Sequence, residues 1–395
     1  MDQVRSGIVG SGFAAAFHRD ALHRVYSVPV EIRGVYSPNA KHRRAFAQEA
    51  NIAEYQSLDS LIDAVDVVHV CTPPATHEAV AAAALQRGRW VVIEKPYTGY
   101  FGDGEAGFHG DTFDRRRGLA QAMASVARLA AAEERAPGGA RVLYAENWVY
   151  APSIQKEREI IEKTDAQILW MHGEAAHSGS HSPVYGVWSH SGGGSVMGKA
   201  VHPLSAALYL KQVEGRHRSG RAIRPVAVSS RVHALTRNPA YRDRGFLRTG
   251  YTDIEDFGQV HVVFEDGTVA DVFASEIVHG GVHNWLEVHG NNHRTVCNIN
   301  PNTAMQTFNP KGEQFQDIYV VEKTETKEGW SSVSPDEAWF TGYQHEMEAF
   351  YQNVADSHEP ESGSLLGADT IAVVYSAYLS AAQAGAEVPL SDITP

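Results

Sequence analysis

The chain has 395 residues, of which 43% are apolar and 21% are charged, a balance typical of a folded globular protein. This length exceeds what one ordinary hydrophobic core holds, so it predicts two domains. The net charge of −13, from 34 basic and 47 acidic residues, argues against a nucleic-acid partner.

Three absences narrow the class of protein further. No stretch approaches the roughly 18 consecutive apolar residues that span a bilayer, so no membrane partner is expected. Cys71 and Cys297 are the only cysteines, too few for a disulfide framework or an iron–sulfur site. The N-terminus enters a strand pattern within a few residues and leaves no room for a signal peptide. We therefore expect a cytoplasmic enzyme.

The first motif is a glycine-rich turn between a strand and a helix. Residues 6–9 are typical of a strand, Gly-x-Gly-x-x-Ala follows at residues 10–15, and apolar residues then recur at helical spacing. Gly10 permits the tight turn, Gly12 lets the backbone approach a pyrophosphate, and Ala15 lets the helix pack on the strand. The N–H groups at the start of the helix can bind the anion. This order predicts a dinucleotide-binding fold.

The second strand, residues 30–36, ends where an NAD site usually carries an acidic residue for the ribose 2′-hydroxyl. This chain has Ser37 there, followed by Asn39 and by cations that include Arg43. The cations make a 2′-phosphate tolerable, whereas Ser37 and Asn39 can also bind a bare ribose. The residues therefore leave both NAD and NADP open.

The third strand, residues 65–70, runs into Cys-Thr-Pro-Pro at residues 71–74 and then into an alanine-rich helix. Two prolines after a buried strand fix a rigid loop at the carboxyl edge of the sheet, where a nicotinamide ribose could rest. His77, at the start of the helix, could face a ligand, or it could cap the helix or lie in solvent.

The next apolar run, residues 90–93, ends abruptly in Glu94-Lys95-Pro96. This pattern predicts a buried parallel strand whose carboxyl end opens onto a site. Ligands of open α/β sheets bind just beyond such ends, and proline cannot continue the strand. Lys95 is therefore the leading candidate for a catalytic residue.

Together, these three motifs resemble the glucose–fructose oxidoreductase / inositol dehydrogenase (Gfo/Idh/MocA) family. The similarity continues at Glu146-Asn147, at residues 192–194 and at His202. It implies an α/β fold, with an N-terminal Rossmann domain at residues 1–150 and a C-terminal α/β domain, built on a large, mostly antiparallel sheet, at residues 151–395. It also implies hydride transfer between NAD or NADP and a hydroxyl carbon of a sugar, cyclitol or glycoside. A homo-oligomer, dimer or tetramer, is expected on the same ground.

The second chemical segment runs from Gly192 to His202. The family normally carries an aspartate four residues before this histidine, and the aspartate, the histidine and the Glu-Lys-Pro lysine form its catalytic group. Here Gly198 occupies the aspartate position. We expect His202 and Lys95 to carry the proton chemistry, because histidine titrates near neutral pH and burial can tune a lysine. The spacing does not say which of the two is the base.

The predicted binding residues form two sets. The cofactor set comprises Gly10, Ser11, Gly12, Phe13, Ala14, Ala15, Ser37, Asn39, Arg43, Cys71, Thr72, Pro73, Pro74, His77, Glu94, Lys95 and Asn147. The substrate set comprises Lys95, Tyr150, His177, His181, Trp188, Lys199 and His202. Lys199 could contact substrate or face solvent.

Histidines are dense between residues 172 and 202. A metal site is one interpretation, since imidazole is a common zinc ligand. No helical histidine pair with a carboxylate accompanies them, so recognition of a polar sugar is favoured, with Trp188 offering an aromatic face. We expect no metal.

Between the lysine strand and residue 146 the chain is longer than is usual in the family. The insertion, about residues 97–117, contains glycines and aromatic residues that suit a lid, an arm to a neighbouring subunit or a disordered excursion. A helix is predicted over 118–134 and the last Rossmann strand over 142–148. Later strands are predicted at 168–175, 227–233, 259–264, 269–277 and 286–289, and helices at 344–354 and 366–383.

Two functions are compatible with these features. The first is an NAD(P)-dependent oxidoreductase that acts on a secondary hydroxyl of a sugar, cyclitol or glycoside. The second is a nucleotide- and sugar-binding sensor that kept the fold and lost turnover. Gly198 favours the second, whereas Lys95 and His202 argue against it.

Overall fold

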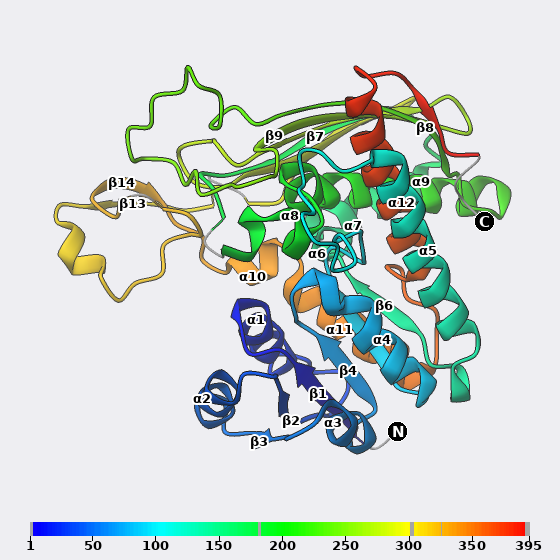
Figure 1. Ribbon diagram of the computed structural model, residues 1–395, viewed down its shortest axis with the longest axis vertical. Helices are drawn as coiled ribbons and strands as arrows, with labels where there is room; N and C mark the ends of the chain where they lie inside the picture. Colours follow the sequence, from blue (N-terminus) through cyan, green and yellow to red (C-terminus); the bar gives the residue numbers. More distant parts are fainter. Residues whose placement is uncertain (1–2, 181–182, 301–303, 325, 392–395) are drawn as a thin grey trace.

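The computed structural model describes residues 3–180, 183–300, 304–324 and 326–391. Two large sheets with helices packed against them make up this part of the chain (Figure 1). The sequence enters the first sheet from the N-terminus, and the second sheet lies across the top of the view. The predicted fold class, a Rossmann domain followed by a mostly antiparallel α/β unit, is confirmed.

The first sheet is parallel, and its described strands lie in the order β3-β2-β1-β4-β5-β6. The strand order reverses between β1 and β4, and open α/β sheets bind ligands at such a switch point. The central strands are buried on both faces, which explains their continuous apolar runs. The elements are β1 (Val4–Val9), α1 (Phe13–Leu22), β2 (Val30–Tyr36), α2 (Ala40–Ala50), β3 (Ala53–Glu54), α3 (Leu58–Ala64), β4 (Val67–Val70), η1 (Pro74–Thr76), α4 (His77–Gln86), β5 (Trp90–Glu94), α5 (Arg115–Glu134), η2 (Pro137–Gly139) and β6 (Val142–Ala145).

The second sheet has the order β12-β11-β7-β10-β9-β8-β15, and only β7 and β10 pair in parallel among the described strands. Helices α9 and α12 pack against it. Large side chains of alternate residues, Leu169, Phe273 and Val296 among them, remain exposed. The elements are α6 (Asn147–Tyr150), α7 (Pro152–Thr164), β7 (Ile168–Ala176), η3 (Pro183–Gly186), α8 (Trp188–Ser191), the π-helix η4 (Val196–Ala200), α9 (Val201–Ser219), β8 (Pro225–His233), β9 (Phe257–Phe264), β10 (Val269–Ser275), β11 (His283–Gly290), β12 (Arg294–Asn298), β13 (Gln306–Asn309), η5 (Gly312–Phe315), β14 (Gly329–Ser332), α10 (Glu337–Phe340) and β15 (Val388–Pro389).

Two C-terminal helices connect the parts of the fold. Helix α11 (Tyr343–Asp356) packs against α1, and α12 (Ser364–Ala382) lies between α5 of the first part and α9 and β8 of the second. Helix α12 is long and apolar enough to cross a bilayer, with a mean hydropathy of 1.4, but 78% of it is buried inside the fold. Its contacts with α5, α9 and β8 place α12 in the core. Long core helices commonly meet the length and hydropathy criteria for a membrane span.

The insertion at 97–117 is docked on the second part of the fold, which excludes a disordered excursion. Tyr97 and Tyr100 are 1% and 2% exposed. The backbone N–H of Gly110 donates to Asp253 Oδ2 at 2.6 Å, and Arg237 forms an ion pair with Asp111. These contacts fix the loop across the junction between the two sheets.

Some sequence boundaries need correction. The strand predicted over 142–148 ends at Ala145, because Glu146 caps a short helix, α6, by accepting from the Trp148 N–H. The sequence did not predict strands β12 to β15. These strands are short and partly exposed, and their apolar residues alternate only weakly.

Candidate active site

The glycine-rich turn lies at the carboxyl end of β1 and is open where a phosphate would approach. Gly10 has a φ of +118°, and a Cβ there would lie 2.2 Å from the carbonyl oxygen of Cys71. A Cβ at Gly12 would meet no heavy atom within 4 Å. Gly12 caps α1 without a side-chain acceptor, so the first N–H groups of the helix stay available. This cradle fits a dinucleotide pyrophosphate.

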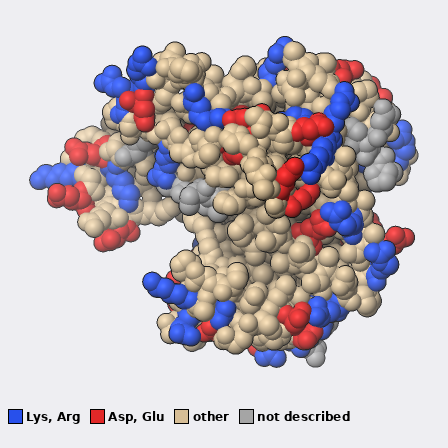
Figure 2. Space-filling view, in the orientation of Figure 1, with Lys and Arg blue, Asp and Glu red and all other residues tan. Residues whose placement is uncertain are grey.

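The remaining residues of the turn differ in exposure. Phe13 is 71% exposed, whereas Ala15 is fully buried against the strands and leaves no room for a larger side chain. Ser11 is exposed in part beside them. Figure 2 shows the surface hollowed between the part built on the first sheet, below, and the part built on the second, above.

The cations predicted near the ribose are not free. The Arg43 guanidinium is 5% exposed and donates to the Ser37 carbonyl at 2.6 Å, to Glu54 at 2.9 Å and to Gln56 at 2.8 Å. Asn39 Oδ1 accepts from two backbone N–H groups and caps α2. Arg43 is thus tied to three protein acceptors, and its contact with a 2′-phosphate stays a prediction.

Two predicted cofactor residues act inside the protein instead. Both ring nitrogens of His77 lie at hydrogen-bond distance from backbone carbonyls, those of Pro96 at 2.9 Å and Thr72 at 3.0 Å. His77 is buried and ties the 71–74 loop to the end of β5, so neither the ligand-facing nor the solvent-exposed interpretation holds. Asn147 is 4% exposed and donates to the Thr341 carbonyl, so we withdraw it from the cofactor set.

Lys95, at the end of β5, extends toward the π-helix η4, which contains Gly198. Its Nζ donates to the carbonyl oxygen of Gly198 at 3.2 Å and lies 5.5 Å from the centroid of the Tyr185 ring. The amine thus joins two segments that are far apart in the sequence. Sequence reasoning did not single out Tyr185.

His202 lies in the first turn of α9, and the Glu146 carboxylate binds its ring. Its Nδ1 lies 2.6 Å from Glu146 Oε1, and its ring stacks on Trp148. Burial lowers the pKa of His202; Glu146 opposes this shift, whereas the positive charges of Lys95 and Lys199 add to it. Because Glu146 is an acceptor, it favours a proton on Nδ1, which leaves Nε2 as the basic nitrogen.

A second histidine is paired with a carboxylate beneath β5. His18 Nε2 lies 3.0 Å from Glu94 Oε1, and His18 Nδ1 lies 2.8 Å from His69 Nδ1, whose Nε2 lies 2.8 Å from the Tyr351 hydroxyl. Burial works to lower the pKa of His18, but Cys71 and Glu94 raise it well above its usual value. Glu94 Oε2 accepts the backbone N–H of Lys95. The chain of contacts therefore fixes Glu94 and the backbone of Lys95.

Two members of the predicted substrate set lie close to a carboxylate that the sequence did not reveal. Lys199 Nζ lies 3.5 Å from Glu276 Oε1, and His177 Nδ1 lies 3.6 Å from Glu276 Oε2. The hydroxyl of Tyr251 also donates to Glu276, at 3.3 Å. Glu276 directly follows β10, and no local motif marks it. His181 lies outside the described residues.

Two other members of that set are corrected. Trp188 is 1% exposed, its ring is packed against Phe113 and Tyr378, and its Nε1 donates to the Tyr100 carbonyl at 3.0 Å, so it offers no face to a sugar. Tyr150 is 3% exposed and accepts the backbone N–H of Ser362. Both residues stabilise the fold around the site.

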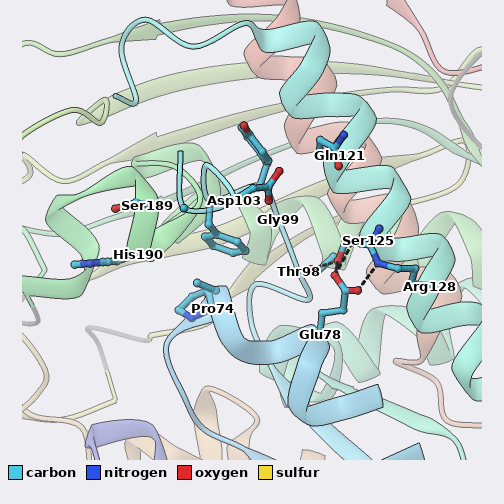
Figure 3. Close-up of a pocket in the computed structure, with 14 residues that line it drawn as sticks. Pro74, Glu78, Thr98, Gly99, Asp103, Gln121, Ser125, Arg128, Ser189 and His190 are labelled. Carbon is cyan, nitrogen blue, oxygen red and sulfur yellow. Dashed lines mark hydrogen bonds and ion pairs between the residues drawn. The ribbon is translucent and has the colours of Figure 1, made fainter. Parts of the chain in front are cut away.

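A separate cavity of about 460 Å³ lies where the inserted loop meets α4, α5 and α8 (Figure 3). Thr98, Ser125, Glu78 and Arg128 lie on one side of it, and a Glu78–Arg128 ion pair lies within this group. Neither Lys95 nor His202 lines it. The insertion thus forms one wall of this cavity, and α4 and α5 supply most of its polar side.

Among the described histidines between residues 172 and 202, His172, His177 and His202 lie against three different carboxylates, those of Glu287, Glu276 and Glu146. Within the described residues, the one group spaced for a metal is His172, Glu287 and His289 on the second sheet, away from Lys95. Glu287 there already binds Arg294 and His172. Hydrogen bonds and ion pairs within the protein therefore explain why these three side chains lie close together.

Comparisons with known proteins agree with this geometry. Residues 4–108 match the family described as an oxidoreductase family with an NAD-binding Rossmann fold, Gfo/Idh/MocA. UDP-N-acetylglucosamine 3-dehydrogenase of Acidithiobacillus ferrooxidans is 36% identical over 98 residues, 25% of this chain and 30% of that protein. Glucose-6-phosphate 3-dehydrogenase of Bacillus subtilis is 32% identical over 90 residues, 23% of this chain and 25% of that protein. These matches span less than a third of either relative.

Solved structures share the fold over nearly the whole chain. GenD2 from gentamicin A biosynthesis, in complex with NAD, superposes with a TM-score of 0.75 at 22% identity over 98% of this chain and 97% of its own. The myo-inositol dehydrogenase of Lactobacillus casei, in complex with NAD(H) and myo-inositol, has a TM-score of 0.67 at 15% identity over 98% and 96%. Residues 4–108 are thus similar to the NAD-binding Rossmann domain of the Gfo/Idh/MocA oxidoreductases, and the solved structures extend the likeness of fold to the rest of the chain.

Proposed function

We propose that the chain is an NAD-dependent oxidoreductase that transfers hydride between nicotinamide and a secondary hydroxyl or ketone carbon of a sugar, cyclitol or glycoside. The observation that carries this proposal is that Lys95, from the end of β5, binds the Gly198 carbonyl four residues before His202, and that its positive charge helps to lower the pKa of His202, which Glu146 holds at 2.6 Å. The relatives named as sugar dehydrogenases support the same class of substrate. Residues 1–150 would bind the nucleotide and residues 151–395 the substrate.

The mechanism follows from the positions of these side chains. The bound nicotinamide supplies a hydride acceptor at C4. His202 Nε2 takes the proton of the substrate hydroxyl as the C–H hydride leaves, and Glu146 stabilises the imidazolium that forms. Lys95 holds the substrate oxygen and stabilises its developing negative charge. In the reverse direction, Lys95 polarises the ketone and His202 returns the proton.

The ribose edge supports NAD rather than NADP. The buried cation nearest to the end of β2, Arg43, is used by three protein acceptors, and Glu54 adds a negative charge to the same edge. Of the two exposed cations there, Arg44 already lies 3.6 Å from Glu54, which leaves Lys41. A 2′-phosphate would therefore meet one exposed lysine and would approach a carboxylate. The cofactor set is reduced accordingly to the turn, the 71–74 loop, Ser37, Asn39, Glu94 and Lys95.

Assembly and location remain predictions. The exposed face of the second sheet, with Leu169, Phe273 and Val296, suits contact with another copy of the chain. The cytoplasmic location rests on the sequence expectation.

The test is a panel of sugars, cyclitols and glycosides, and their keto forms, assayed with NAD, NADP, NADH and NADPH. We expect hydride transfer with at least one panel member, faster with NAD. Cofactor binding without transfer to or from any member would contradict the proposal and support the sensor alternative.

A further inference from the structure

A carboxylate borders the space beside Gly198. Among the residues that the structure describes, and apart from the neighbouring backbone, a Cβ built on Gly198 would meet one atom within 4 Å, Glu276 Oε1 at 3.8 Å. The carbonyl of the same glycine accepts the Lys95 amine. A carboxylate on residue 198 would therefore point into space that Glu276 already borders, next to the reacting centre.

Glu276 is held in a built polar environment. The residue is 3% exposed, its backbone N–H donates to Asp256 at 2.9 Å, and its carboxylate accepts the hydroxyls of Ser180 at 3.2 Å and Tyr251 at 3.3 Å. Burying a carboxylate requires compensating charge, and Lys199 Nζ supplies it at 3.5 Å. Tyr251 binds Oε2, and the Ser180 hydroxyl reaches Oε2 at 3.2 Å and Oε1 at 3.4 Å. Oε1 also faces Lys199 and lies 3.8 Å from the position of a Cβ on Gly198.

We propose that Glu276, directly after β10, supplies the active-site carboxylate that the π-helix η4 lacks at residue 198, and that it accepts a hydrogen bond from a substrate hydroxyl next to the reacting carbon. This inference rests on the proposed function and deepens it, because it commits the substrate to vicinal hydroxyls. Lys199 holds Oε1 toward the substrate, while Lys95 and His202 bind the reacting oxygen.

The experiment is a relocation of the carboxylate. Glu276→Gln keeps the size of the side chain and the contacts of Tyr251 and Ser180, and we expect kcat/KM to fall about tenfold or more, mainly through KM. The Cβ of Gly198→Asp would meet no described atom closer than Glu276 Oε1 at 3.8 Å, and in the Glu276→Gln background we expect this substitution to recover part of the loss. In the wild-type background, Gly198→Asp places two carboxylates together and should lower activity.

The substrate provides an independent readout that a structural role would not move. The best panel substrate is compared with its analogue that lacks the hydroxyl next to the reacting carbon. Wild type should lose about tenfold on this change, and Glu276→Gln should lose little more, because the partner of that hydroxyl is already gone. Independent, multiplicative losses would overturn the inference, as would a failure of Gly198→Asp to recover any activity.

The role of Glu276 can be wrong even if the proposed function is right. Turnover by wild type, with unchanged turnover by a folded Glu276→Gln, would overturn the role of Glu276 alone. If wild type turns over no panel member, the proposed function fails, and calorimetry of panel sugars with the NAD complex still decides the inference. Equal affinities for wild type and Glu276→Gln would then overturn it, and weaker binding by the variant would support it.

Discussion

The two sides of the proposed site differ in how their side chains are held. On the side of the first sheet, Glu94 is bound by His18 and by the Lys95 backbone, and Arg43 is used by its neighbours. On the side of the second part, His202 is hydrogen-bonded to Glu146 through Nδ1, and in the described part of the chain a Cβ on Gly198 would meet Glu276 Oε1 alone within 4 Å. The first side is a fixed support for a cofactor, whereas the second has the room that a substrate needs.

The largest effect is expected where the two sides meet. Lys95→Ala should lower kcat/KM by about a hundredfold or more, because the charge that stabilises the substrate oxygen is lost. Lys199→Ala removes a positive charge that contacts Glu276 instead of the reacting oxygen, so it should lower kcat/KM less. Steady-state rates with NAD measure both variants, and equal losses would mean that Lys95 has no special role.

The next effect tests the support behind His202. Because the base is the neutral imidazole, kcat/KM for alcohol oxidation should fall as pH drops through the His202 pKa, which burial keeps below its usual 6.5. Glu146 raises that pKa, so Glu146→Gln should move the acid limb to lower pH and reduce the plateau by about tenfold to a hundredfold. Ketone reduction should show the opposite pH dependence.

The matched control is Glu159→Gln. Glu159 is a surface carboxylate on α7 that pairs with Lys156 and Lys163, remote from the site. Its pH–rate profile should coincide with that of wild type. An acid limb unaffected by Glu146→Gln would refute the coupling of Glu146 to His202.

Two glycines of the cofactor turn should separate stability from binding. Gly12→Ala fits the folded chain, so its melting temperature should stay near that of wild type while NAD binding weakens by about tenfold, as the methyl obstructs the pyrophosphate. Gly10→Ala brings its Cβ against the Cys71 carbonyl and should destabilise the fold itself. Calorimetric titration with NAD and thermal unfolding measure the two effects; the reverse ranking would contradict this assignment.

The smallest effect on activity is expected at Trp188. Trp188→Phe leaves a ring in the packed cluster with Phe113 and Tyr378 but removes the hydrogen bond to Tyr100, so it should lower the melting temperature and leave KM nearly unchanged. A rise in KM without a loss of stability would restore the sugar-stacking role that the sequence suggested.

The sequence predicted the first side well because its chemistry is local. The glycine turn and Glu94-Lys95-Pro96 each lie at a strand end, and parallel strands bring such ends to one edge. The partners of these residues could not be predicted: His18 meets Glu94, and Arg43 meets Glu54, only after the fold forms.

The second side depends on contacts between distant segments. Glu276 follows a strand with no motif of its own, yet it lies beside Gly198 and Lys199. Trp188 and Tyr150 have residue types suited to sugar binding, but their burial depends on the inserted loop and on the segment that precedes α12. Composition and spacing contain no information about such packing.

The central claim is that Lys95 and His202 act on one substrate oxygen. The most direct test is a double-mutant cycle of Lys95→Ala and His202→Asn, with kcat/KM for the best panel substrate and NAD. Residues that act as a unit are strongly non-additive, so the double variant should be little slower than the slower single variant. Losses that multiply would show that the two residues work independently and would contradict the account.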